Sequence, residues 1–302
     1  MQDVEFIQCG REITAAEIEK IRSTVTDLGR LSRSSIIEAV CEELQWFAAT
    51  GAYKIEACTK LLGKLEAQGF LELPDKRKPG GVPRQNLKDT LPQVNKAQGL
   101  EVVGKLGDIG PINLTMVEND RDVSSWNALV ARYHYLGYSK PIGCFMRYFV
   151  CAPEVGILGC VLFAGAARSL TFRDAWIGWT SRQRLRNLAW VINNVRFLIL
   201  PSVRVIHLAS HVLGQLERRV ALDWEQRWGY RPVLMESFVD PSAFRGTCYR
   251  AANWQYLGNT TGEGLARRGR SYQTTAKMLF VRPLVADFRS HLCADRLTGR
   301  VL

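Results

Sequence analysis

The sequence lacks the cysteine spacings that mark redox or zinc sites. Its eight cysteines include no Cys-x-x-Cys pair, and Cys160, inside an apolar run, is typical of a small buried side chain. We therefore predict no disulfide framework and no zinc cluster. This cysteine usage fits the reducing environment of the cytoplasm.

Long apolar runs are also missing. The longest, over 190–206, is interrupted by two asparagines and two arginines, so we expect no membrane-spanning helix. The first ten residues contain acids and no apolar segment, which argues against a secretory signal peptide. Both absences predict a cytoplasmic protein with no membrane partner.

Acidic residues are outnumbered. There are 40 Lys and Arg against 29 Asp and Glu, which gives a net charge of +11. A folded protein this basic often binds a polyanion, although a basic surface that serves only solubility is the alternative. At 302 residues and 47% hydrophobic composition, the chain is long enough for two domains.

Residues 1–75 have the pattern of a small helical module. Thr14 and Glu17 are spaced as a capping box, which predicts a helix start. A second helix is predicted over 35–44. A third is predicted over 55–68, because its apolar residues recur at helical spacing.

A strand-like stretch over 70–74 follows the third helix, and a cationic turn comes after it. Three helices and such a wing resemble the winged helix-turn-helix family, whose third helix enters the major groove of DNA. Lys54, Lys60 and Lys64 would then contact phosphates or bases. A helical protein-interaction module with a solvated basic face is the alternative, and we favour DNA binding.

Residues 76–111 are rich in proline and glycine and show no helical or strand period. This predicts a connector along the surface. Its cations, which include Lys76, Arg77 and Lys78, would add phosphate affinity that is independent of DNA sequence. A solvated tether is the alternative.

Residues 112–302 combine strands and helices without regular alternation. We predict helices over 119–138 and 207–228, a hairpin of strands over 145–151 and 157–163, and further strands over 196–200 and 232–239. The whole chain is therefore predicted to be α+β, with a winged helix-turn-helix-like module followed by a mixed α/β domain.

The strand, loop and helix start over 196–210 resemble the GCN5-related acetyltransferase superfamily, whose loop cradles the pyrophosphate of coenzyme A. Arg204 and Ala209 match that loop, and Tyr249 corresponds to a late tyrosine of the family. His207, however, stands where the first glycine belongs, and its side chain would crowd a close backbone approach. The resemblance implies an acetyltransferase-like domain; the mismatch argues against acetyl-CoA and leaves any cofactor unknown.

A second resemblance covers most of the chain. It is carried, in this order, by Tyr133-His-Tyr-Leu-Gly137, Arg173-Asp-Ala-Trp-Ile-Gly-Trp179, Asn193-Asn-Val-Arg-Phe-Leu-Ile-Leu-Pro201, Glu236-Ser-Phe-Val-Asp240 and Gly246-Thr-Cys-Tyr-Arg-Ala-Ala-Asn-Trp254. These strings resemble the DruA family of the Druantia anti-phage defence system. The resemblance implies defence against phage DNA with other subunits, including a large helicase-like protein. The last string also resembles Mom-type DNA-modification proteins.

The candidates for chemistry are His134, Glu236, Asp240, Tyr249 and Asn253. His134 could be a general base or a hydrogen-bonded structural histidine. Glu236 and Asp240 could hold Mg²⁺ together with Asp174, or pair with arginines, which we favour. Tyr249 and Asn253 could line a pocket, stack a flipped base or fill the core.

His207 and His211 are four residues apart and could share a helix face. Two histidines on one face can bind a metal, but no third ligand lies near them in the sequence. We therefore predict no metal site.

Two arginine clusters complete the predicted nucleic-acid contacts. The first consists of Arg182, Arg184 and Arg186 in a stretch without any acid, and the second consists of Arg267, Arg268 and Arg270 among glycines. Phosphate binding is the functional interpretation, and solvated loops are the alternative.

We predict a DNA-binding subunit of an anti-phage defence system. The alternatives are an acetyltransferase-like enzyme that modifies DNA bases, and a metal-dependent nuclease. The sequence leaves open whether the C-terminal domain is catalytic.

Overall fold

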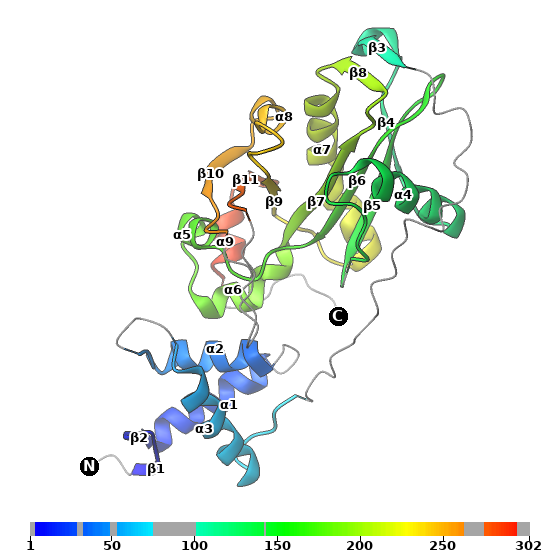
Figure 1. Ribbon diagram of the computed structural model, residues 1–302. Coiled ribbons are helices and arrows are strands. Elements are labelled where there is room, and N and C mark those ends of the chain that lie inside the picture. Colours follow the sequence, from blue (N-terminus) through cyan, green and yellow to red (C-terminus); the bar gives the residue numbers. More distant parts are fainter. Residues whose placement is uncertain are drawn as a thin grey trace. The chain divides into compact units, whose positions relative to one another are not determined.

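A computed structural model describes residues 4–28, 33–48, 53–74, 101–141, 143–262 and 275–294. Two compact units divide the chain (Figure 1). The first holds the described residues of Met1–Pro83, Trp179–Asn187 and Cys293–Arg296, and the second holds the rest. The first unit is therefore not one continuous segment, because a piece from the middle of the chain belongs to it.

The first unit begins with a hairpin that the sequence pattern did not reveal, made of β1 (Val4–Gln8) and β2 (Arg11–Thr14). Helix α1 (Ala15–Leu28) follows directly. The predicted capping box is confirmed, since Glu17 N donates to Thr14 Oγ1 at 3.3 Å and Thr14 N donates to Glu17 Oε2 at 3.0 Å. Side chain and backbone thus satisfy each other at the start of the helix.

The predicted second and third helices are confirmed as α2 (Arg33–Glu43) and α3 (Ile55–Ala67). The apolar face of α3 is buried in a core shared with α1 and α2. The strand expected for a wing is missing, since residues 70–74 form no strand. The turn expected after it, at residues 76–78, lies outside the described residues, so the winged-helix assignment stays a prediction.

Helix α6 (Ser181–Asn187) also belongs to the first unit. Its Leu185 joins the hydrophobic core of α1, α2 and α3, and Tyr53 Oη lies 2.9 Å from Ser181 Oγ. A helix this far along the chain could not be assigned to the unit from its own pattern, because the partners it packs against are distant in sequence.

The second unit is built on a mixed sheet. Its strands are β4 (Asn113–Met116), β5 (Phe145–Ala152), β6 (Gly156–Gly165), β7 (Val191–Ile199), β9 (Leu234–Val239), β10 (Gln255–Asn259) and β11 (Met278–Pro283). They lie in the order β10-β11-β9-β7-β6-β5-β4 (Figure 1). All neighbours are antiparallel except β7 and β9, which are parallel.

Several predicted elements of this unit are confirmed. The hairpin of β5 and β6 forms, and the two long helices are α4 (Asp120–Tyr133) and α7 (Leu208–Trp228). Each helix carries a fully buried tryptophan, Trp126 on α4 and Trp224 on α7. Trp126 Nε1 also donates to Tyr148 O at 3.0 Å, which ties α4 to β5.

Most short elements were missed. They include β3 (Val102–Lys105), β8 (Val203–Ile206), α5 (Thr171–Ile177), α8 (Thr247–Ala251) and α9 (Phe288–Leu292), with the 3-10 turns Leu106–Asp108 and Leu188–Trp190. Strand β3 pairs in parallel with β8. It therefore corrects the expectation that residues 76–111 carry no strand, because its partner lies about a hundred residues further along the chain. Within the described part of the chain, no helix is both long and apolar enough to cross a membrane.

Strands β7 and β9 are neighbours over only part of their length. They pair from Val191 and Leu234 to Asn194 and Ser237. Beyond these residues β7 continues to Ile199 and β9 to Val239, but no further pairing joins these two described strands. The sheet is thus open at one end of its parallel pair.

Candidate functional site

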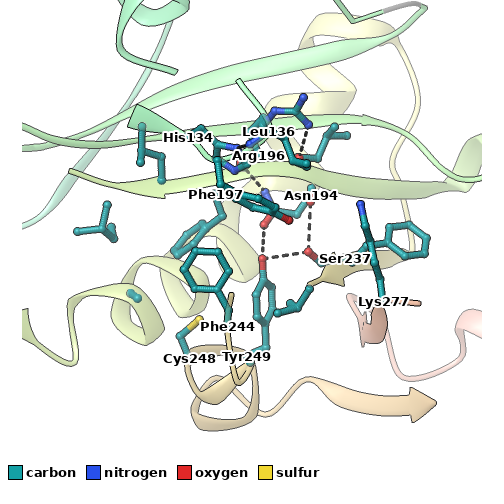
Figure 2. Close-up of a pocket in the computed structure, with 18 of the residues that line it drawn as sticks. His134, Leu136, Asn194, Arg196, Phe197, Ser237, Phe244, Cys248, Tyr249 and Lys277 are labelled. Carbon is teal, nitrogen blue, oxygen red and sulfur yellow. Dashed lines mark hydrogen bonds between the residues drawn. The ribbon is translucent and has the colours of Figure 1, made fainter. Parts of the chain in front are cut away.

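A cavity of about 410 Å³ lies at this opening. Its lining comes from the end of α4, from β7 and β9, and from the loop that leads into α8 (Figure 2). The volume is within the range of about 300–1,000 Å³ that is typical of ligand sites. The space exists because β7 and β9 do not pair with each other beyond Asn194 and Ser237, and no other described strand lies between them.

A hydrogen-bonded network of Asn194, Ser237 and Tyr249 closes one part of the cavity (Figure 2). Tyr249 Oη donates to Asn194 Oδ1 at 2.9 Å, and Ser237 Oγ donates to Tyr249 Oη at 2.9 Å. Burial raises the pKa of Tyr249, so its hydroxyl stays protonated at neutral pH. Tyr249 is buried and lines the cavity, and its hydroxyl is already engaged.

His134 lies where α4 ends and also lines the cavity. Its Nδ1 accepts a hydrogen bond from Leu136 N at 3.2 Å, and its ring stacks on Tyr135 with 4.9 Å between ring centroids. Burial, followed by the positive charge of Arg196, lowers the pKa of His134 to about 4. The imidazole is therefore neutral at pH 7 and adds no charge to the site.

This low pKa makes stability depend on pH. The pKa of His134 is about 4 in the folded state against a reference pKa of 6.5, so the unfolded chain takes up a proton first and stability falls as the pH drops through that window. Between pH 7 and pH 4.5 this effect is expected to lower the free energy of unfolding by about 1–2 kcal/mol, after allowance for partial exposure. The variant His134→Asn should lack this decrease. Urea unfolding at both pH values measures it, with His211→Asn as control. An unchanged pH dependence in His134→Asn would contradict the assignment.

Positive side chains line the cavity, and no carboxylate is among the lining residues that the structure describes. The cations are Arg196, Arg245 and Lys277. Arg196 is 8% exposed and donates to Gly137 O at 2.9 Å and to Ser139 Oγ at 3.3 Å. Because a buried cation that has no carboxylate partner is costly, the arrangement favours an anionic ligand.

One acid lies close to the cavity without lining it. Asp240 Oδ1 accepts from Ser242 Oγ at 2.6 Å, and Asp240 Oδ2 accepts from Thr275 Oγ1 at 3.2 Å. The hydrogen bonds from Ser242 lower the pKa of Asp240, with a smaller contribution from Lys277. Asp240 therefore stays ionised and offsets part of the charge of Lys277.

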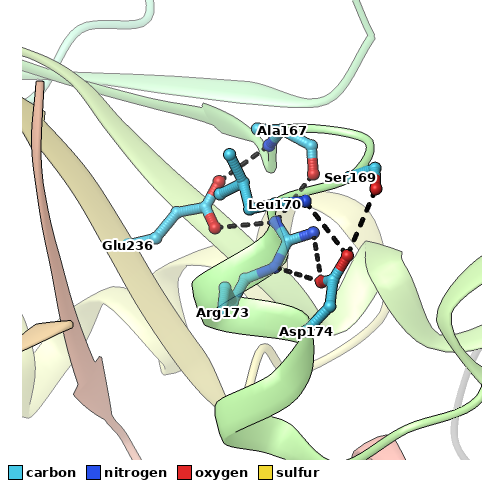
Figure 3. A network of polar contacts seen from close by, with 6 residues as sticks. All are labelled: Ala167, Ser169, Leu170, Arg173, Asp174 and Glu236. Carbon is cyan, nitrogen blue, oxygen red and sulfur yellow. Dashed lines mark hydrogen bonds and ion pairs between the residues drawn. The ribbon is translucent and has the colours of Figure 1, made fainter. Parts of the chain in front are cut away.

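Glu236 is fully buried and does not line the cavity. Its Oε1 accepts from Ala167 N at 2.7 Å, and its Oε2 pairs with Arg173 Nη1 at 2.8 Å (Figure 3). Arg173 also pairs with Asp174 at 2.8 Å. Burial disfavours the charged form of Arg173, but the carboxylates of Glu236 and Asp174 favour it more strongly. The pKa of Arg173 is therefore raised. Pairing with arginine is the alternative that the sequence favoured for Glu236 and Asp174. It was also favoured for Asp240, whose carboxylate instead accepts hydrogen bonds from Ser242 and Thr275.

The remaining catalytic candidate, Asn253, follows α8 and is exposed. Its φ of 59° lies in the left-handed region, where asparagine is enriched. This conformation gives a local reason for the residue type. Across the described residues, no group of three or more His, Cys, Asp or Glu is placed to hold a metal ion.

The three coenzyme-loop residues fall in different places. Ala209 lines the cavity, but Arg204 and His207 do not. Arg204 is exposed and lies 3.8 Å from Glu101, and His207 precedes α7 with a φ of 65°. A positive φ there is the conformation that a glycine would supply.

The basic residues that were predicted to contact nucleic acid also lie in different environments. Lys54, Lys60 and Lys64 are exposed at and along α3, with Lys60 3.6 Å from Glu56. Arg182 pairs with Asp27 and Glu43, each at 3.1 Å. Arg186 also pairs with Asp27, and Arg184 is buried. Lys76, Arg77, Lys78, Arg267, Arg268 and Arg270 lie outside the described residues.

Acids from other helices thus offset Arg182 and Arg186 of α6. The stretch around α6 contains no acid, but Asp27 lies on α1 and Glu43 on α2. A count along the sequence could not reveal these pairs. The sequence analysis did not identify four lining residues, which are Tyr135, Phe244, Arg245 and Lys277. The signal available for the two aromatic ones was their position close to glycines.

The solved structures with a similar arrangement include acetyltransferases. Spermidine N-acetyltransferase from Vibrio cholerae is 11% identical over 57% of this chain and 95% of its own, with a TM-score of 0.37. A putative acyl-CoA N-acyltransferase from Klebsiella pneumoniae is 13% identical over 58% and 98%, with a TM-score of 0.33. A putative acetyltransferase from Acinetobacter baylyi is 9% identical over 57% and 93%, with a TM-score of 0.37. At these scores, we base no function on the likeness.

Comparison with curated proteins gave no match. A family model, in contrast, matches residues 64–277, which is more than half of the chain and includes every residue of the cavity lining. Its description is Druantia protein DruA, in agreement with the resemblance carried by the sequence strings. The chain belongs to the DruA family.

Proposed function

We propose that this member of the DruA family is a DNA-binding component of a Druantia anti-phage defence system, acting with other subunits that include a helicase-like protein. Family membership implies the defence role. The observation that carries DNA binding is the cavity, whose described lining has three cations and no carboxylate. A site of this charge attracts a polyphosphate chain.

The exposed lysines of α3 give the proposal a second surface. Lys54 and Lys64 have no carboxylate partner among the described residues, and Lys60 has only an exposed one. Exposed ion pairs contribute little, so Lys60 remains available to a phosphate. Helix α3 carries these cations away from its buried residues.

Salt dependence tests the proposal. We expect the full chain to bind a 30-base-pair duplex with an affinity that falls steeply as the NaCl concentration rises. Each lost phosphate contact should reduce the slope of log affinity against log NaCl concentration by about 0.9. Two double variants should each flatten this slope: Arg245→Ala with Lys277→Ala, and Lys60→Ala with Lys64→Ala. Fluorescence anisotropy from 50 to 300 mM NaCl measures the slope.

The control is Lys20→Ala, which removes an exposed lysine from α1 in the first unit. It should leave both slope and affinity unchanged within error. Affinity that does not change with salt, or no binding to either duplex or single strand, would refute DNA binding.

A further inference from the structure

Two exposed aromatic side chains lie together in the lining of the cavity. Tyr135 is 46% exposed and Phe244 is 53% exposed, and their ring centroids are 5.4 Å apart. They come from separate segments, one after α4 and the other after β9. Exposed apolar surface that converges from two segments marks a binding surface.

His134 holds one of these rings in place. It stacks on Tyr135 at 4.9 Å and is itself fixed by the hydrogen bond from Leu136 N. A ring positioned in this way loses little freedom when a second flat ring stacks on it. Such base-aromatic stacking is the common means by which proteins hold unpaired bases.

The polar network of the cavity retains acceptor capacity. Ser237 Oγ can donate its single hydrogen to Tyr249 Oη at 2.9 Å or to Asn194 O at 3.2 Å. A hydroxyl also has two acceptor lone pairs, and no donor among the described residues reaches those of Ser237. A ligand that brings an N–H group to this part of the cavity can therefore donate to Ser237 Oγ. The edges of DNA bases carry such donors.

We infer that the cavity takes one unstacked nucleotide of a DNA chain, with the base against Tyr135 and Phe244, its edge at Ser237 and its phosphate at Arg245 and Lys277. This rests on the proposed DNA binding. A cavity of about 410 Å³ has room for a single nucleotide and not for a duplex. The nucleotide must leave the stack, which costs least where it is unpaired.

The test compares two duplexes of equal length and charge, one fully paired and one with a single mismatched base pair. We expect the full chain to bind the second about tenfold more tightly, as measured by fluorescence anisotropy. Tyr135→Ala and Phe244→Ala should each reduce this preference by about fivefold or more, up to its complete loss. Tyr135→Phe should retain it, because the ring remains.

Phe172→Ala is the matched control. Phe172 is 47% exposed in the same unit but does not line the cavity, so its loss should leave the preference intact. Thermal melting checks that each variant folds.

The outcomes separate the two proposals. Equal binding of both duplexes would overturn the unstacked-nucleotide inference and leave DNA binding standing. Binding to neither would overturn both. Displacement of the oligonucleotide by acetyl-CoA, lost in Tyr135→Ala, would assign the cavity to a coenzyme and overturn the inference.

Discussion

Replacing Glu236 by alanine is expected to lower the free energy of unfolding by about 3–5 kcal/mol. Glu236 is 0% exposed, and its carboxylate pairs with Arg173, which is also 0% exposed. Removing one partner leaves a buried charge without its main counterion and the amide of Ala167 without its acceptor. Urea unfolding monitored by tryptophan fluorescence measures the loss.

A surface pair provides the comparison. Glu225 lies 2.6 Å from Arg231, and both side chains are about half exposed, so Glu225→Ala should cost at most about 1 kcal/mol. Arg173→Met combined with Glu236→Leu should cost less than Glu236→Ala, because this pair then leaves no charge buried. If Glu236→Ala cost no more than Glu225→Ala, the buried pair would not have the structural role assigned to it.

Replacing Gly159 by alanine is expected to lower the free energy of unfolding by about 1–3 kcal/mol. A Cβ at this position in β6 would clash with the backbone oxygen of Leu198 and lie 3.2 Å from Ile199 Cδ1. Backbone in the centre of a sheet cannot move aside as a flexible side chain can. The strain would reach β7, which lines the cavity, so DNA affinity should fall as well.

Gly165 gives a control on the same strand. A Cβ there would meet no atom within 4 Å, so Gly165→Ala should change the free energy of unfolding by less than about 0.5 kcal/mol. Equal effects of the two substitutions would contradict the close approach of β6 and β7 at Gly159. Chemical denaturation of both variants decides between these outcomes.

The buried pair and the cavity share one strand. Glu236 and Ser237 are neighbours on β9, and Glu236 holds the loop of Ala167 while Ser237 takes part in the network of the cavity. Successive side chains of a strand point to opposite faces of the sheet. One side chain therefore stabilises the fold, and the next borders the site.

Local signals predicted the elements that depend only on neighbouring residues. The capping box of Thr14 and Glu17, the hairpin of β5 and β6 and the long helix α7 follow from spacing within a few residues. Short elements such as β3 were missed because their stability comes from a distant partner, here β8. A short strand that is stabilised by a distant partner shows no hydrophobic periodicity in its own sequence.

The sequence by itself determined the excess of positive charge, the first three helices of the first unit, the α+β class and the strings that resemble DruA proteins. Only the tertiary structure decided which charges are available. It paired Arg182 with acids from α1 and α2, buried Glu236 against Arg173, and brought Tyr135, Phe244 and Lys277 to one cavity. The reason is that electrostatic and stacking interactions depend on distance in space, whereas the sequence records only distance along the chain.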